Sequence, residues 1–313
     1  MAALRSRTYT ACSGCSLCLL SCHVWRTTHD IRLTPHGRAK AMQHGATAGD
    51  LVASLNSCTL CGACEPACPE SIDLVGMVTG LRGEFARDLE PRAEFNSVLP
   101  APTDTISTPT ILIADQALTD NPALLQSIIG QFGGHLAISV AVDSGTDISF
   151  ALTQGLAISA ERLDHFLTPL KITLRVIVAD GRLFYALKNW LHGVTIASLG
   201  EAISTLPQVR EKLSDDDFYV IESVAFHRDH ERLISHYDNL RLASGCAMNL
   251  DLQRMAIPTT ANSRYNGRVA VDDQVNWILE GRAPKRIVVE DVADIAAFKR
   301  VANVPVIHIG ALL

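Results

Sequence analysis

The sequence predicts a metal-binding N-terminal unit followed by two α/β units with mostly parallel sheets. Three observations lead to this fold class. Eight of the nine cysteines lie before residue 69 of the 313-residue chain. Residues 91–109, which follow them, contain four prolines and no apolar periodicity. Beyond this segment, short apolar stretches alternate with amphipathic ones, a pattern typical of strands and helices in α/β layers.

Composition and charge narrow the classes of function. Hydrophobic residues make up 48% and charged residues 19% of the chain, which is typical of a globular protein. The formal charge of −6 and the pI near 6.0 argue against a nucleic-acid-binding protein, which usually carries a basic surface. No apolar run approaches the roughly 20 residues that span a bilayer, and no signal-peptide core precedes the first cysteine. We expect a cytoplasmic protein without a transmembrane segment, which can reach the inner face of a membrane through its partners.

The chain divides at its proline-rich segment. We predict a cysteine-bearing domain over residues 1–92, a linker over 93–109 and a first α/β unit over 110–210. In that unit, apolar segments predict buried strands and the stretches between them predict helices. The predicted strands are Ile111–Ala114, Leu136–Val142, Thr173–Ala179 and Val194–Ser198, and the predicted helices are Asn121–Phe132, Ala160–Leu167 and Arg182–Leu191.

A second series with a similar layout occupies residues 215–313. Its predicted strands are Tyr219–Ser223, Arg286–Val289 and Val304–Ile309, and its predicted helices are Asp229–Ala243, Asp272–Glu280 and Val292–Val301. Late in each series an apolar strand ends in a short acidic turn, in VIVADGRLFYAL and in IVVEDVADIAAF. We therefore interpret the two series as copies of one α/β unit.

Two cysteine runs with identical spacing carry the chemistry of the N-terminal unit. The runs are Cys12-x2-Cys15-x2-Cys18-x3-Cys22 and Cys58-x2-Cys61-x2-Cys64-x3-Cys68, the second followed by Pro69. Three cysteines spaced by two residues can wrap one corner of an iron–sulfur cubane, and the fourth is carried by the following helix to the neighbouring cluster. The pattern predicts two [4Fe–4S] clusters, one held by Cys12, Cys15, Cys18 and Cys68 and the other by Cys58, Cys61, Cys64 and Cys22.

Zinc is the alternative metal. Structural zinc sites use paired cysteine knuckles in a tetrahedral arrangement, which two runs of four with identical spacing do not match. Residues 1–57 contain six Arg or Lys and two Asp, an excess that fits the negative charge of a cluster or forms a solvated basic face. His23 stands where Pro69 follows the second run. It could tune a cluster, take part in proton-coupled steps, or simply pack.

The two runs, the intervening segment LTPHGRAKAMQ and the Cys68-Pro69 ending resemble the α-helical ferredoxin domain. This domain occurs in iron–sulfur subunits of succinate dehydrogenase and fumarate reductase, glycolate oxidase, lactate utilisation, anaerobic glycerol-3-phosphate dehydrogenase and heterodisulfide reductase. The resemblance covers residues 8–85. It implies an α-helical ferredoxin domain with two [4Fe–4S] clusters.

The remainder of the chain is similar to the twin cysteine-rich, or CCG-type, domains that follow this ferredoxin in the glycolate oxidase and heterodisulfide reductase group. In that group, CCG and C-x2-C elements bind a further cluster, which is noncubane in heterodisulfide reductase. Other residues stand at the corresponding positions here: Ile257–Asn262, Arg264–Gly267, Glu290 and Asp291 in the second unit, and Asp143–Gly145, Asp180 and Gly181 in the first. We therefore expect two degenerate CCG-like units that provide a docking scaffold.

Other candidate residues have simpler explanations. Cys246 is a lone cysteine, and one thiolate cannot hold a cluster, so we expect a buried structural residue. His227 and His230 could face a metal, although a polar helix start explains them as well. The sequence contains neither a dinucleotide fingerprint nor a P-loop, and no nucleophile–base pair is evident. We therefore predict no catalytic residue and no cofactor beyond the clusters.

The leading hypothesis is a non-catalytic electron-transfer subunit of an oxidoreductase complex. The resemblance implies a flavoprotein dehydrogenase subunit, acting on a small 2-hydroxy acid or similar metabolite, as the donor. It implies a quinone, a membrane quinone reductase or another electron carrier as the acceptor. Two alternatives stay open: a heterodisulfide-reductase-like catalytic subunit with an active cluster in its C-terminal half, and a structural or sensor module.

Overall fold

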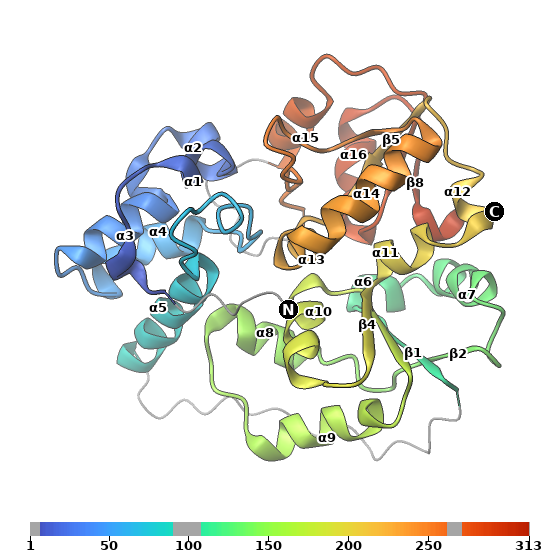
Figure 1. Cartoon of the computed structure of the whole chain (residues 1–313), viewed down its shortest axis with the longest axis horizontal. Helices are drawn as coiled ribbons and strands as arrows, with labels where there is room; N and C mark the ends of the chain where they lie inside the picture. The colour runs from blue at the N-terminus through green and yellow to red at the C-terminus, as the bar shows by residue number, and fades with distance from the viewer. Residues whose placement is uncertain (1–6, 90–107, 262–270, 313) are drawn as a thin grey trace.

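The computed structural model of the protein describes residues 7–89, 108–261 and 271–312. Within them the chain forms a helical N-terminal unit and two α/β units, each built on a four-stranded sheet. Figure 1 shows the N-terminal unit in blue beside the first α/β unit, in green and yellow, and the second, in orange and red. Of the predicted linker, only Thr108 and Pro109 belong to the described residues.

Short helices surround the two cysteine runs in the N-terminal unit. They are α1 (Leu17–Leu20), α2 (His23–Thr28), α3 (Pro35–Gln43), α4 (Val52–Ser57) and α5 (Leu74–Leu89), with the 3-10 turns η1 (Tyr9–Ala11), η2 (Ile31–Leu33) and η3 (Gly49–Leu51). Helix α3 begins where its sequence favours a helix start, because the Thr34 hydroxyl accepts the Gly37 N–H and Pro35 stands in the first turn. Leu55 of α4 and Val78 of α5 pack in one small hydrophobic core.

The first α/β unit contains all four predicted strands; the first is shifted by one residue and the other three are shorter than expected. Its parallel sheet has the order β2-β1-β3-β4. The strands are β1 (Thr110–Ile113), β2 (Ile138–Val140), β3 (Arg175–Val178) and β4 (Thr195–Ser198). Its helices are α6 (Gln116–Thr119), α7 (Pro122–Gln131), α8 (Thr146–Gln154), α9 (Ala160–Lys171), α10 (Gly181–Trp190), α11 (Leu199–Ser204) and α12 (Pro207–Arg210). Strands β1 and β3 are continuous apolar runs because helices cover both faces of a parallel sheet.

The second α/β unit repeats this topology. Its parallel sheet has the order β6-β5-β7-β8, so the central pair β5 and β7 corresponds to β1 and β3. The strands are β5 (Asp217–Val220), β6 (Ala247–Met248), β7 (Arg286–Val289) and β8 (Val306–His308). The helices are α13 (Ser223–Arg228), α14 (His230–Ser244), α15 (Val271–Leu279) and α16 (Val292–Val301), followed by the turn η4 (Ile309–Ala311). The shared strand order agrees with the interpretation of two copies.

The two α/β units are joined by elements that follow their last strands. Helix α11, which follows β4, shares one hydrophobic core with α14 of the second unit, where Ile203 and Leu233 are both buried. Turn η4, which follows β8, packs in return on α7 of the first unit, where Ser127 donates a 2.7 Å hydrogen bond to the Gly310 carbonyl. The two units therefore share a core instead of folding side by side.

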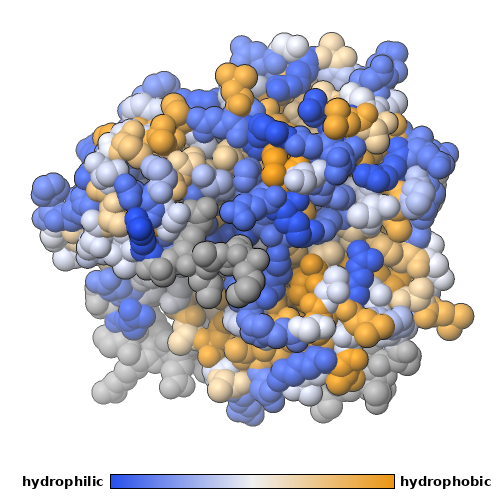
Figure 2. Space-filling view, viewed as in Figure 1, coloured by the Kyte–Doolittle hydropathy of each residue, from blue (hydrophilic) through white to orange (hydrophobic). Residues whose placement is uncertain are grey.

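Hydrophobic side chains are not evenly spread over the surface. On the face shown in Figure 2 they gather over the first α/β unit, whereas hydrophilic residues cover the centre of the view. Exposed apolar residues of this unit include Leu136, Val142, Ile172 and Leu174. None of the helices in the described ranges is both long and apolar enough to cross a bilayer.

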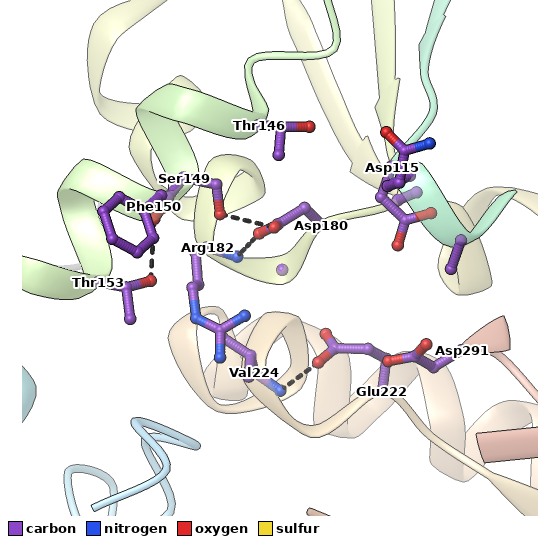
Figure 3. A pocket seen from close by; sticks show the side chains of 14 residues that line it. Asp115, Thr146, Ser149, Phe150, Thr153, Asp180, Arg182, Glu222, Val224 and Asp291 are labelled. Atoms are coloured by element: carbon purple, nitrogen blue, oxygen red, sulfur yellow. Dashed lines mark hydrogen bonds between the residues drawn. The ribbon is translucent and has the colours of Figure 1, made fainter. Parts of the chain in front are cut away.

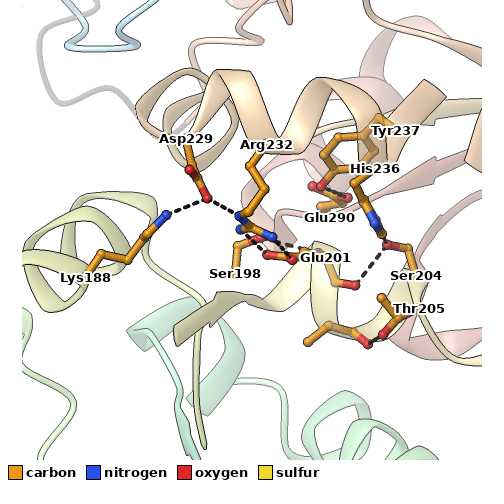
Figure 4. A network of polar contacts seen from close by, with 11 residues as sticks. Lys188, Ser198, Glu201, Ser204, Thr205, Asp229, Arg232, His236, Tyr237 and Glu290 are labelled. Atoms are coloured by element: carbon orange, nitrogen blue, oxygen red, sulfur yellow. Dashed lines mark hydrogen bonds and ion pairs between the residues drawn. The ribbon is translucent and has the colours of Figure 1, made fainter. Parts of the chain in front are cut away.

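A polar network also ties the α/β units together (Figure 4). Asp229, between α13 and α14, forms a 2.6 Å ion pair with Lys188 of α10 and a 2.5 Å ion pair with Arg232 of α14. Arg232 also contacts the carboxylate of Glu201 in α11, with Nη2 2.8 Å from Oε2. Charges from helices α10, α11 and α14 therefore meet Asp229 at the junction.

Candidate iron–sulfur centre

The two cysteine runs adopt matching backbone conformations. In both runs, the residues before and after the second cysteine have positive φ: Gly14 (85°) and Ser16 (65°) in the first, Leu60 (57°) and Gly62 (80°) in the second. This conformation is unfavourable for Ser16 and Leu60, and such residues cluster at functional sites. Turns of this kind direct successive N–H groups toward one side and form the anion-binding concavities found at iron–sulfur sites. The two loops therefore have the same local design.

Cys22 of the first run lies with the thiols of the second run. These cysteines line one shared pocket: Cys22, Cys58, Cys61 and Cys64. Burial, followed by the charges of Cys58 and Cys22, raises the pKa of Cys61 to about 12. Burial also raises the pKa of Cys64 well above its usual value. The fourth cysteine of one run is thus near the first three of the other.

Cys68 lies near Cys18 of the first run, close enough for its charge to affect that thiol. Burial is the main cause that raises the pKa of Cys18 to about 12, and the next contributions come from the charges of Cys22, Cys68, Cys12 and Cys15. Cys15 is exposed, whereas the other seven motif cysteines are partly buried. The first run therefore lies nearer the surface than the second.

The predicted basic residues have different roles. Arg38 is only 1% exposed and donates 2.9 Å hydrogen bonds to the carbonyls of Leu33 and Ser54. Its positive charge lowers the pKa of Cys22, although burial makes the net shift of that thiol upward. Lys40 donates a 3.0 Å hydrogen bond to the Cys12 carbonyl. Lys40 thus contacts a cysteine loop directly, whereas Arg38 acts on Cys22 through its charge.

The donor set fits a [4Fe–4S] cluster. All nine cysteines are free thiols, and four of them surround the pocket around Cys22. Binding to iron removes the thiol proton, which offsets the raised pKa that burial imposes on these groups. Within residues 7–89, 108–261 and 271–312, no group of three or more Cys, His, Asp or Glu is placed to hold a metal ion. Cys22, Cys58, Cys61 and Cys64 line one pocket, and four thiolates around one space are the ligand set of a [4Fe–4S] cluster.

His23 lies in the same pocket as these thiols. Its side chain is buried, with a ring nitrogen within hydrogen-bond distance of Cys61 and of Thr59. Burial, followed by the charge of Arg26, lowers the pKa of His23 to about 4. The sequence left open whether His23 tunes a cluster, takes part in proton-coupled steps or simply packs. The structure places it beside a candidate cluster ligand.

His227 contacts the second cysteine run, which neither interpretation of the sequence included. The sequence left it open between a metal-facing residue and a polar helix start, whereas it is 4% exposed and lies in the last turn of α13. Its Nδ1 lies 2.7 Å from the carbonyl oxygen of Cys61. The two residues are 166 positions apart, so no local pattern in the sequence could have paired them. The ring of His230 meets the Phe226 ring edge-on, 5.2 Å between centroids.

Cys246 is a structural residue, as expected. It is 0% exposed in the core that joins the two α/β units, and its sulfur accepts a 3.0 Å hydrogen bond from Ser244. Burial raises the pKa of its thiol. This thiol is therefore enclosed by packing.

A cavity of about 230 Å³ lies between the two α/β units (Figure 3). Four carboxyl groups line it, and each follows a central strand and caps the next helix: Asp115 after β1, Asp180 after β3, Glu222 after β5 and Asp291 after β7. The carboxyl ends of parallel strands are the usual ligand-binding edge of a sheet. Asp180 and Asp291 are among the residues at the positions that the sequence comparison relates to CCG and C-x2-C elements.

The charge of this cavity favours cationic or proton-bearing groups. Arg182 is the one basic residue among its lining side chains in the described part of the chain. Burial raises the pKa of Glu222 to about 7 and also raises that of Asp291. A smaller pocket shares Arg182, Glu222 and Asp291 with this cavity and reaches Cys61 of the N-terminal unit. The second cysteine run therefore borders the space between the α/β units.

Other residues at the positions compared with CCG elements form structural contacts or lie outside the described residues. Asp143 forms a 2.7 Å ion pair with the buried Arg162. The CCG element of the second unit was expected at Ile257–Asn262, where residues 257–260 are buried and Asn262 lies outside the described residues. The segment Arg264–Gly267 that follows also lies outside them.

Comparison with known families supports the iron–sulfur assignment. Residues 8–72 match the model of the 4Fe–4S dicluster domain. No curated protein matches the chain. The match supports an iron–sulfur protein with at least one [4Fe–4S] cluster and a role in electron transfer, and it coincides with the helical unit that contains both cysteine runs.

Proposed function

We propose that this chain relays single electrons through two [4Fe–4S] clusters with exchanged fourth ligands. The observation that carries the proposal is the pocket that Cys22 shares with Cys58, Cys61 and Cys64. One cluster is held by these four thiols and the other by Cys12, Cys15, Cys18 and Cys68. A bound [4Fe–4S] cluster supplies reversible one-electron redox chemistry.

The residues of the chain define two ends of this relay. The exposed Cys15, with Leu17 and Leu20 exposed close by, marks the end that a redox partner can approach. The loop around Cys61 is covered by the α/β units through His227. Exclusion of water around this loop protects the second cluster and makes its potential sensitive to nearby hydrogen bonds.

The sequence contains no second cofactor motif, so a separate protein supplies the redox chemistry, and the resemblance to iron–sulfur subunits with an α-helical ferredoxin domain indicates its class. We assign a flavin-dependent dehydrogenase of a 2-hydroxy acid or similar metabolite as the donor, and a quinone, a membrane quinone reductase or another carrier as the acceptor. The α/β units serve as a docking scaffold, and the complex works in the cytosol, reaching the inner face of the membrane through its partners. Affinity capture from the native host, followed by mass spectrometry, tests this assignment and should recover a flavoprotein.

Anaerobic iron analysis and redox titration test the relay itself. We expect about eight irons per chain and two reversible one-electron transitions. Substantially more iron would favour the catalytic alternative with a further cluster. Clusters without a reversible transition would favour a structural or sensor module. Zinc in place of iron would overturn the proposal.

A further inference from the structure

The imidazole of His23 contacts the sulfur of one candidate cluster ligand. Its Nδ1 lies 3.9 Å from Sγ of Cys61, within hydrogen-bond distance for sulfur, and its Nε2 lies 3.3 Å from Oγ1 of Thr59. The side chains of His23 and Thr59 are buried at 4% and 7% exposure. Their positions are therefore determined by packing and not by solvent.

The chemistry of an iron-bound cysteine decides the direction of this hydrogen bond. A thiolate ligand has no proton, so it can only accept, and the neutral imidazole must place its N–H on Nδ1 to satisfy it. The Nε2 lone pair then accepts the proton of the Thr59 hydroxyl, which holds the ring in this tautomer. His23 and Thr59 thus form one hydrogen-bonding unit directed at Cys61.

The second run has a different residue at the position of His23. The identical spacing of the two runs pairs His23 with Pro69, and Cys61 with Cys15. Proline has neither a side-chain donor nor a backbone N–H. At this position of the motif, one run therefore carries a hydrogen-bond donor and the other does not.

We infer that His23 is a positioning residue that raises the reduction potential of the cluster bound by Cys61. This inference rests on the proposed relay and adds to it the cause of a difference between its two clusters. Reduction adds one electron and one unit of negative charge, which spreads over the cluster and its thiolates. A hydrogen bond donated to a cysteine sulfur stabilises that charge more in the reduced state than in the oxidised state. The donor thereby offsets part of the cost of burying this cluster.

The substitution His23→Pro tests the inference by copying the second motif. His23 occupies the first position of α2 after its N-cap Cys22, where proline is well tolerated. Potentiometric titration followed by electron paramagnetic resonance should show one of the two potentials falling. At a fixed applied potential we expect the ratio of reduced to oxidised cluster to fall about tenfold. For a one-electron couple this corresponds to a reduction potential lower by about 59 mV. The altered signal should be the one that Cys61→Ser also changes.

Two further variants separate tuning from a merely structural effect. In His23→Asn, the side-chain amide can place its N–H near the former Nδ1 position, so we expect this variant to restore most of the potential. His44→Leu removes an exposed histidine of the same unit and should change neither potential. Thr59→Val keeps the imidazole of His23 but removes the hydroxyl that holds it in one tautomer. This variant should lower the same potential by less than His23→Pro does. It tests the inference even if the His23→Pro variant fails to assemble its clusters.

Three results would overturn the inference: unchanged potentials in His23→Pro and Thr59→Val, equal shifts of both clusters, or an Asn variant that behaves like the Pro variant. Failure of the proposed relay gives a different result. In that case the unmodified protein itself shows no iron–sulfur signal or no reversible transition.

Discussion

The Nδ1 atom of His227 lies 2.7 Å from the carbonyl oxygen of Cys61. Because a carbonyl only accepts, Nδ1 carries the proton and donates it. The Cβ atom of His227 also lies against Gly62, where an added methyl group would come within 3.2 Å of it. Beside this contact, Arg228 forms a 3.0 Å ion pair with Glu65. The second α/β unit therefore holds the loop of the second cysteine run in place.

Replacement of His227 should loosen the cluster loop. We expect His227→Leu to release iron from one cluster several-fold faster than the unmodified protein does. The buried Cys61 carbonyl loses its hydrogen-bond donor, and the side chain that packs against Gly62 changes shape. The decay of the visible iron–sulfur absorbance in the presence of a chelator measures this rate. His192→Leu, which changes an exposed histidine, is the control and should leave the rate unchanged. Equal rates in both variants would show that the contact does not restrain the loop.

The exchanged ligation predicts a reciprocal pair of phenotypes. Cys22→Ser should impair the cluster that depends on Cys58, Cys61 and Cys64, and Cys68→Ser should impair the other, because oxygen is a poorer ligand for cluster iron than thiolate. Electron paramagnetic resonance of the reduced variants should show that each variant loses the signal of a different cluster. If each variant instead loses the cluster of its own run, the ligands are not exchanged.

The buried ion pairs of Arg162 should contribute more to stability than an exposed pair of the same type. Arg162 is 2% exposed and contacts Asp143 and Asp147, each at 2.7 Å. Arg162→Met leaves two carboxylates without their partner and should lower the free energy of unfolding by about 3–5 kcal/mol. Lys171→Met removes an exposed pair with Asp164 and should cost less than about 1 kcal/mol. Urea unfolding followed by circular dichroism measures both, and similar losses would contradict the assignment.

Glu290 should make the stability depend on pH. Its carboxylate accepts hydrogen bonds from the Tyr219 and Tyr237 hydroxyls at 2.6 and 2.7 Å, and burial raises its pKa from 4.5 to about 7. Between these pH values the folded state binds more protons than the unfolded state, so the free energy of unfolding falls as pH rises from about 4.5 to 7. Above pH 7 this contribution levels off.

Substitution of Glu290 by Gln tests that linkage. Urea titrations between pH 4.5 and 7.5 should give a shallower pH dependence for Glu290→Gln, with a difference of at most about 3 kcal/mol across the range. Some slope should remain, because burial raises the pKa of Glu222 as well. The variant should also be less stable at every pH, since the Glu222 N–H loses its 2.8 Å acceptor. Parallel curves for the two proteins would exclude Glu290 as the source.

Several parts of the fold could be predicted from local sequence. Strand β7 lies at the predicted residues, Arg286–Val289, because a continuous apolar run between turns has few alternatives in a covered parallel sheet. Strand β6 was not predicted, since Ala247–Met248 is too short to show a period. Helix α8 was not predicted either, because its capping glycine Gly145, with φ of 62°, also fits a simple turn.

The candidate site also has features that local sequence predicts and features that depend on distant contacts. Thiol spacing is a local property, and it alone indicated which eight cysteines matter. The contact between His227 and Cys61, by contrast, depends on how α13 packs against a loop 166 residues earlier in the chain. The four carboxyls of the cavity were not predicted as a group, because their convergence requires both sheets to bring their carboxyl edges together.

Sequence alone determined the metal chemistry of this protein, because the number, type and spacing of ligands are written in two short segments that need no distant contact. Only the tertiary structure decided which surroundings those ligands have. It placed His23 beside one sulfur, closed the second loop under an α/β unit and left Cys15 exposed. Burial, hydrogen bonding and electrostatic environment are properties of packed neighbours, and packing joins residues that the chain keeps far apart.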